Sequence, residues 1–60
     1  MKIKEYKNGA WTVFDRVMPS GYWLVKLYQP DGNLEDKILC DDYTNARNYF
    51  KSFNLIARGM

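Results

Sequence analysis

The strongest hydrophobic pattern lies in the last third of the chain, in the segment DYTNARNYFKSFNLIAR at positions 42–58. At 3.6 residues per turn its apolar side chains share one helical face: Tyr43, Ala46, Tyr49, Phe50, Phe53, Ile56 and Ala57. The pattern predicts the only helix of the chain. Asp41 or Asp42 suits its N-cap, and Arg58 followed by Gly59 suits its C-terminal end.

The first thirty positions show patterns typical of β-strands. Residues 11–17, WTVFDRV, are rich in β-branched and aromatic side chains and predict a strand. Residues 22–29, YWLVKLYQ, form β-structure most strongly and are apolar on both faces, which predicts a central strand. Residues 1–7, MKIKEYK, alternate only weakly, so they form either a short edge strand or a frayed arm. We favour the edge strand.

Gly-containing turns separate these segments. Asn8-Gly9 is a strong signal for a two-residue type I′ hairpin turn, and Met18-Pro19-Ser20-Gly21 interrupts the next pair of strands. Counted from Asn8-Gly9, the first hairpin would pair Tyr6 with Trp11, Lys4 with Val13 and Ile3 with Phe14.

A second hairpin is predicted around Pro30-Asp31-Gly32-Asn33. A two-residue Asp31-Gly32 turn sets the pairs Trp23–Cys40, Leu24–Leu39, Val25–Ile38, Lys26–Lys37 and Tyr28–Glu35. This register gathers one apolar face that suits the floor beneath the helix: Trp23, Val25, Leu27, Ile38 and Cys40. A slip of one residue would turn every side chain to the other face.

Together these elements predict an α+β fold in one domain, residues 1–60. We expect a small antiparallel meander sheet of three to four strands with one C-terminal helix packed on one face. A chain of this length buries only about 60% of the surface that its unfolded form exposes. Dense packing of its aromatic side chains, 17% of all residues, would compensate for the small core.

Composition argues against catalysis and against bound metal. The chain has no His, and it lacks a Gly-rich phosphate loop, a CxxC pair and an HExxH motif. Its single cysteine, Cys40, excludes a disulfide within the monomer and predicts a small buried thiol in a reducing compartment. No apolar segment is long enough to cross a bilayer. We therefore expect a cytoplasmic, non-enzymatic protein without a cofactor.

Two surfaces are candidates for binding a partner. The first is the sheet face turned away from the helix, where apolar and tyrosine side chains lie among charges: Tyr22, Leu24, Lys26, Tyr28, Lys37 and Leu39. The alternative is that the N-terminal segment or the lysine stems cover this face. The second is a basic helix edge formed by Arg47, Lys51 and Arg58, either a solvated face or a contact for phosphates or an acidic partner.

The run YWLVKLYQPDGNLEDKILCDDYTNARNYF, about half of the chain, resembles the core of the integrase-arm and ethylene-response type of DNA-binding domain. The resemblance rests on inward Trp23, Val25 and Leu27, the Asp31-Gly32 turn, Cys40 at the strand end and Ala46 in the helix. In that family a three-stranded sheet lies in the DNA major groove. The resemblance therefore implies that Leu24, Lys26, Tyr28 and Lys37 face DNA.

Charge ranks the two functional hypotheses. Only two of those four residues are basic, none is Arg, and the net charge of the chain is +2. Phosphate neutralisation supplies most of the non-specific affinity for DNA, and Arg is the commonest reader of guanine. We therefore favour a protein-interaction module of the accessory or inhibitor type that binds a larger protein or self-associates. Its size suggests a stand-alone phage protein, and nucleic-acid binding through the sheet is the alternative.

Overall fold

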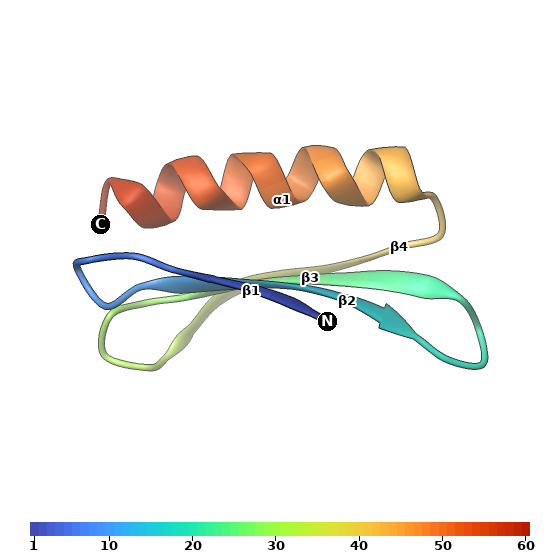
Figure 1. Cartoon of the computed structure of the whole chain (residues 1–60), viewed down its shortest axis with the longest axis horizontal. Helices are drawn as coiled ribbons and strands as arrows, with labels where there is room; N and C mark the ends of the chain where they lie inside the picture. Colours follow the sequence, from blue (N-terminus) through green and yellow to red (C-terminus); the bar gives the residue numbers. More distant parts are fainter.

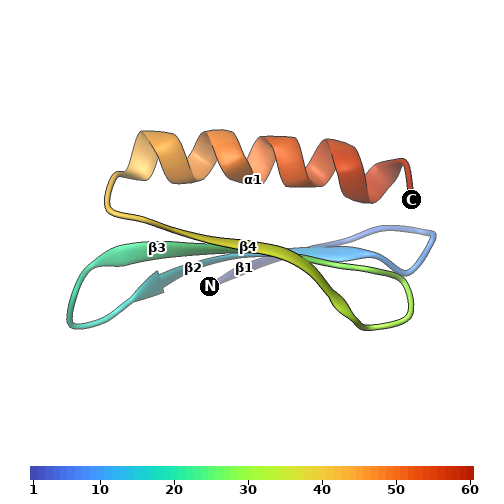
Figure 2. The ribbon, with the colours of Figure 1, turned by 180° about the vertical axis from the view of Figure 1, so that it is seen from behind.

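The computed structural model describes residues 1–60 and confirms the α+β architecture. Four antiparallel strands follow one another in the sheet in chain order: β1 (Lys2–Glu5), β2 (Trp11–Val17), β3 (Tyr22–Tyr28) and β4 (Leu34–Cys40). Helix α1 (Tyr43–Arg58) then runs back across one face (Figure 1). From behind, the same two layers are seen, and no element lies on the other side of the sheet (Figure 2).

The helix contacts the sheet along a narrow stripe. Its buried residues recur at spacings of four, three and four, and they pack with Val25 and Leu27 of β3: Ala46, Phe50, Phe53 and Ala57. The buried stripe is narrower than the apolar face predicted from the sequence, since Tyr43, Tyr49 and Ile56 at its margins remain 51%, 43% and 50% exposed. Only the helix side chains that point directly at the sheet are buried between the two layers.

The helix begins where its capping chemistry predicts. Asp42 is the N-cap, and its carboxylate accepts a hydrogen bond from the backbone N–H of Asn45 at 3.1 Å. Of the two aspartates that the sequence offered, Asp41 is therefore not the cap. The backbone N–H of Gly59 donates to the carbonyl of Ile56 at 3.0 Å and closes the last turn. The helix lacks the length and apolar character needed to cross a membrane.

The second hairpin has the predicted inner register and a different turn. Trp23, Leu24, Val25 and Lys26 face their expected partners on β4, whereas Tyr28 faces Leu34 instead of Glu35. The loop has three residues, because the backbone N–H of Gln29 donates to the carbonyl of Asn33 at 2.8 Å and Gly32 takes a φ of +93°. A bulge at Glu35 removes the resulting offset, so the inner pairs match those of a two-residue turn.

The first hairpin has the same kind of loop without a compensating bulge. The backbone N–H of Tyr6 donates to the carbonyl of Ala10 at 2.9 Å, and Gly9 has a φ of +95°. Asn8 does not adopt a positive φ, which excludes the predicted type I′ turn. The register is one residue away from the prediction, with Ile3 opposite Val13 and Lys4 opposite Thr12. Consequently every side chain of β1 is turned to the other face.

Strand β1 is an edge strand, as favoured from the sequence, although it is shorter than residues 1–7. The helix packs on β2, β3 and β4 and leaves β1 beside it. Because Phe14 and Thr12 point toward the helix, their partners Lys2 and Lys4 rise on the same side of the sheet. These two lysines and the helix border a hollow between the helix and the edge strand.

Candidate functional site

The sheet face opposite the helix, here called the bare face, carries all six residues of the first predicted surface. Successive strand residues point to opposite faces, and Val25 and Leu27 belong to the core beneath the helix. The residues between and beside them therefore point away from the helix: Tyr22, Leu24, Lys26, Tyr28, Lys37 and Leu39. Tyr22 and Leu39 are 43% and 55% exposed, and no helix covers them (Figure 2).

Strand β2 extends the bare face beyond the predicted residues. The ring of Trp11 stacks on that of Tyr28 with centroids 4.6 Å apart and planes at 10°. Val13 is only 8% exposed although no second layer covers it, since Ile3 and Lys26 flank it on the neighbouring strands. The predicted surface did not include Trp11 and Val13. The alternation within WTVFDRV is the sequence signal that could have placed them there.

Two lysines stand side by side at the centre of the bare face. Lys26 on β3 is directly opposite Lys37 on β4. Like charges in this position destabilise an antiparallel pair. Glu35, predicted to pair with Tyr28, is the bulge residue outside the regular pairing. The N-terminal segment does not fold across this face, because it extends the sheet at its edge.

The basic helix edge forms one wall of a groove. Three hollows follow one another between α1 and the β1 hairpin, and each shares lining residues with the next. On the helix side they are lined by Arg47, Lys51 and Arg58. Their volumes are about 350, 520 and 430 Å³. The opposite wall supplies three further cations, Lys2, Lys4 and Lys7. We call this surface the basic groove, and it holds six of the nine Lys and Arg residues of the chain.

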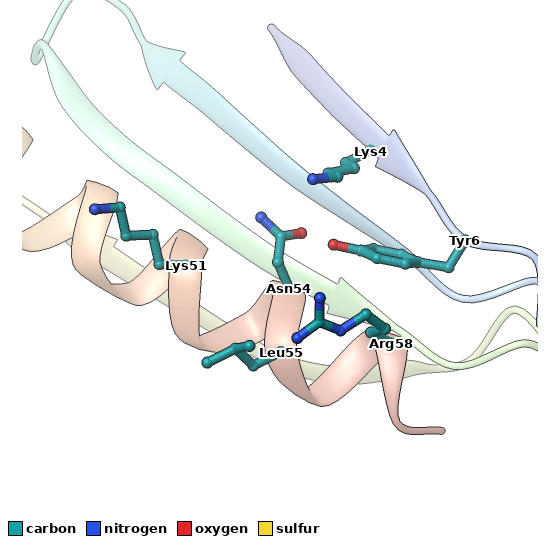
Figure 3. Close-up of a pocket in the computed structure, with 6 residues that line it drawn as sticks. All are labelled: Lys4, Tyr6, Lys51, Asn54, Leu55 and Arg58. Atoms are coloured by element: carbon teal, nitrogen blue, oxygen red, sulfur yellow. The ribbon is translucent and has the colours of Figure 1, made fainter.

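The central hollow shows how the two walls converge (Figure 3). Lys4 and Tyr6 extend from the β1 side toward Asn54 and Arg58 on the helix. The ammonium of Lys4 lies 5.8 Å from the centroid of the Tyr6 ring. None of the residues lining the three hollows is acidic. The groove therefore presents hydrogen-bond donors and positive charge along its length.

A buried hydrogen bond orients Asn54 in this groove. The hydroxyl of Thr12, which is fully buried on β2, donates to Oδ1 of Asn54. With its oxygen engaged, the side chain leaves its amide nitrogen as the group available to a ligand. Sequence reasoning missed Lys2, Lys4, Lys7 and Tyr6 as members of this site. The alternation of MKIKEYK indicates that Lys2, Lys4 and Tyr6 share a face, and the erroneous register turned them away from the helix.

Neither surface carries a cluster of potential metal ligands. No three His, Cys, Asp or Glu side chains lie close enough together to hold a metal ion. The thiol of Cys40 is buried, and this burial, together with the negative charges of Asp41 and Asp42, raises its pKa above the ordinary 9.0. A raised pKa disfavours the nucleophilic thiolate.

Comparison of this chain with protein-family models, with curated proteins and with solved structures finds no match. The resemblance to the integrase-arm and ethylene-response type of domain therefore stays a prediction.

Proposed function

We propose that the protein is a non-enzymatic interaction module that binds a larger protein through the bare face of its sheet. The observation that carries this proposal is the uncovered layer itself. A sheet with one packed face ordinarily directs polar residues to its other face. Here Leu24, Leu39, Tyr22 and the stacked pair Trp11–Tyr28 lie on it among the charged residues.

The composition of the bare face suits a protein surface. Large aromatic side chains contribute contact area with little loss of conformational entropy, and contiguous exposed apolar patches mark interaction sites. The stacked rings of Trp11 and Tyr28 already restrict each other before binding. This pre-organisation lowers the entropic cost of association.

The paired lysines indicate what the partner carries opposite them. Lys26 and Lys37 repel each other in the free protein, and an incoming carboxylate would relieve that repulsion. We therefore expect an apolar partner surface with at least one Asp or Glu that reaches this pair. A larger protein with this surface, bound in the cytoplasm, is the occupant that we propose, and self-association is the competing outcome.

Nucleic-acid binding through the same face, the alternative from the sequence, receives less support. Asp15 and Glu5 point to the bare face, because they pair with Leu24 and Trp11 across the sheet. Their carboxylates would oppose phosphates next to the two lysines. No arginine lies on this face. Arg16, the only arginine in the sheet, points to the helix side, where its Cζ lies 5.2 Å from the centroid of the Trp23 ring.

Affinity capture with matched variants tests the proposal. Leu39→Lys places a charge on the bare face, and Ile56→Lys places the same charge on the helix at nearly equal exposure, 55% against 50%. We expect a partner captured by the wild-type chain to be retained by Ile56→Lys and weakened more than about tenfold by Leu39→Lys. Equal retention by both variants would show that the bare face is not the interface.

A further inference from the structure

The basic groove lies away from the bare face and is not explained by the proposed function. Its six cations outnumber the net charge of +2, so the remainder of the surface is net acidic. No acidic side chain enters its three hollows. A concentration of like charge in a concave site focuses the electrostatic potential there and attracts an oppositely charged ligand. The fold maintains this concentration at a cost in self-repulsion.

The cations recur along both walls. Arg47, Lys51 and Arg58 recur at intervals of about one to two turns over about 16 Å of helix. Lys2 and Lys4 project from the facing strand, and Lys7 follows in the hairpin loop. A ligand in this groove therefore meets positive charge at repeated intervals along its path. Such a ligand is a chain with a negative charge on every unit.

Aromatic rings lie between these charges. Tyr6 lines the central and C-terminal hollows, and Phe14 and Tyr43 line the N-terminal one. Tyr43 is 51% exposed, and its ring meets those of Phe14 and Trp23 in edge-to-face contacts. A basic groove with aromatic platforms is the combination that binds single-stranded nucleic acid without sequence preference. Phosphates follow the cations, and unpaired bases stack on the rings.

We propose that the basic groove binds a short single-stranded segment of DNA or RNA, about four nucleotides long, in the lower part of the range for small single-strand-binding folds. A duplex cannot place its bases on Tyr6 or Tyr43, because paired bases are stacked inside it. An acidic peptide would satisfy the cations and leave the rings and the amide nitrogen of Asn54 without a specific role. The Thr12 hydroxyl orients that amide so that it donates toward a base edge or a phosphate.

Fluorescence anisotropy with the full chain tests this proposal. The probes are labelled DNA and RNA oligonucleotides of about 12 nucleotides, the corresponding duplex and a glutamate-rich peptide, each at about 50 and about 200 mM NaCl. With about four phosphates neutralised, the logarithm of the association constant falls with a slope of about −3, which weakens single-strand binding about 50-fold between these salt concentrations. Duplex and peptide bind more weakly at both.

Charge-reversal variants locate the site. Lys4→Glu and Lys51→Glu change the two walls of the groove, and Lys37→Glu makes the same change of net charge on the bare face. We expect each groove variant to weaken single-strand binding at least fivefold and to reduce the magnitude of the salt slope, and Lys37→Glu to weaken binding less than twofold. Circular dichroism is the control that checks whether each variant is folded. Tyr43→Leu, which keeps apolar bulk without a ring, weakens binding by about threefold or more.

Four results would overturn the proposal. The first is an absence of oligonucleotide binding at the lower salt concentration. The second is equal weakening by Lys37→Glu and by the groove variants, which would indicate attraction by net charge alone. The third is equal or tighter binding of the duplex. The fourth is a glutamate-rich peptide that binds as tightly as the oligonucleotide and displaces it, which would assign the groove to acidic proteins.

Discussion

The side-chain nitrogen Nδ2 of Asn8 donates a hydrogen bond of 2.8 Å to the backbone carbonyl of Ala57, across 49 positions of the chain. The same nitrogen donates to the carbonyl of Met60 at 3.0 Å, while Oδ1 accepts from the backbone N–H of Ala10 at 2.8 Å. One amide thus closes the first hairpin loop and satisfies carbonyls at the C-terminal end of the helix. It ties the hairpin to the helix at the end where the basic groove finishes.

Replacing Asn8 by Asp separates these two roles. Aspartate keeps the acceptor for Ala10 and loses the donor, and its negative charge faces the carbonyl end of the helix dipole. We expect a loss of about 1–3 kcal/mol in the free energy of unfolding, measured by urea denaturation. Asn48→Asp is the control on an exposed helical position. A loss no greater than that of the control would remove Asn8 from the contacts that hold the fold together.

The two hairpins show how far the sequence specifies this fold. The strands, the helix and its cap could be predicted, because alternation, helical periodicity and aspartate are local signals. Loop length could not, since Asn8-Gly9 and Asp31-Gly32 suit both a two-residue turn and a three-residue loop with Gly at positive φ. In the first hairpin the loop side chain Asn8 also bonds the carbonyl of Ala57, a contact that no local pattern reveals.

The same ambiguity had opposite consequences at the two sites. At the bare face a bulge at Glu35 restored the expected register, so Lys26, Lys37 and Leu39 lie where the sequence placed them. At the first hairpin no bulge intervenes, and Lys2 and Lys4 turn toward the helix. The facing wall of the basic groove could therefore not be predicted. Bulges carry no reliable signal in a single sequence.

The lysine pair predicts that a change can stabilise the free protein while impairing its function. Lys37→Glu replaces a repulsion with an attraction to Lys26, directly opposite on β3. We expect the free energy of unfolding to rise by about 0.2–1 kcal/mol. For a domain of this size, 1 kcal/mol corresponds to a shift of about 4–8 °C in the melting temperature, which calorimetry detects. Partner binding through the bare face should weaken.

The double variant Lys26→Glu/Lys37→Glu is the matched control, because it again places like charges directly opposite each other in the same cross-strand pair. It should leave the melting temperature of the free protein nearly unchanged. If the two variants shifted it equally, net charge and not the cross-strand pair would explain the effect.

Cys40 should be inert in the folded protein. Burial, followed by the charges of Asp41 and Asp42, raises its pKa above 9.0, so the folded state holds the neutral thiol. We expect slow reaction with a maleimide at neutral pH and rapid reaction after denaturation. Labelling at the same rate before and after denaturation would contradict the burial.

The same shift makes stability depend on pH in a defined direction. Below the unfolded-state value near 9.0 both states hold the proton, so the stability of the fold is fully present. As the pH rises above that value, the unfolded chain ionises first and the fold loses stability until the folded-state pKa is passed. Cys40→Ala should lose less stability over this interval, as measured by urea denaturation at pH values on both sides of 9.0. Equal losses in the two proteins would contradict the linkage.

The helix cap gives a further prediction. Asp42→Ala removes the acceptor for the N–H of Asn45 and should cost about 1 kcal/mol in the free energy of unfolding. Asp41→Ala, one residue earlier, keeps that hydrogen bond and should cost less. The reverse order in urea denaturation would assign the cap to Asp41.

Site-specific photocrosslinking tests the proposed interface most directly. A benzophenone amino acid at Leu39 lies on the bare face, and the same probe at Ile56 lies on the helix at nearly equal exposure. In cells that contain the partner, the Leu39 probe should yield a discrete adduct with a larger protein, and the Ile56 probe should not. An adduct from Ile56 alone, equal adducts from both, or an adduct only with a second copy of the chain would contradict the proposed interface.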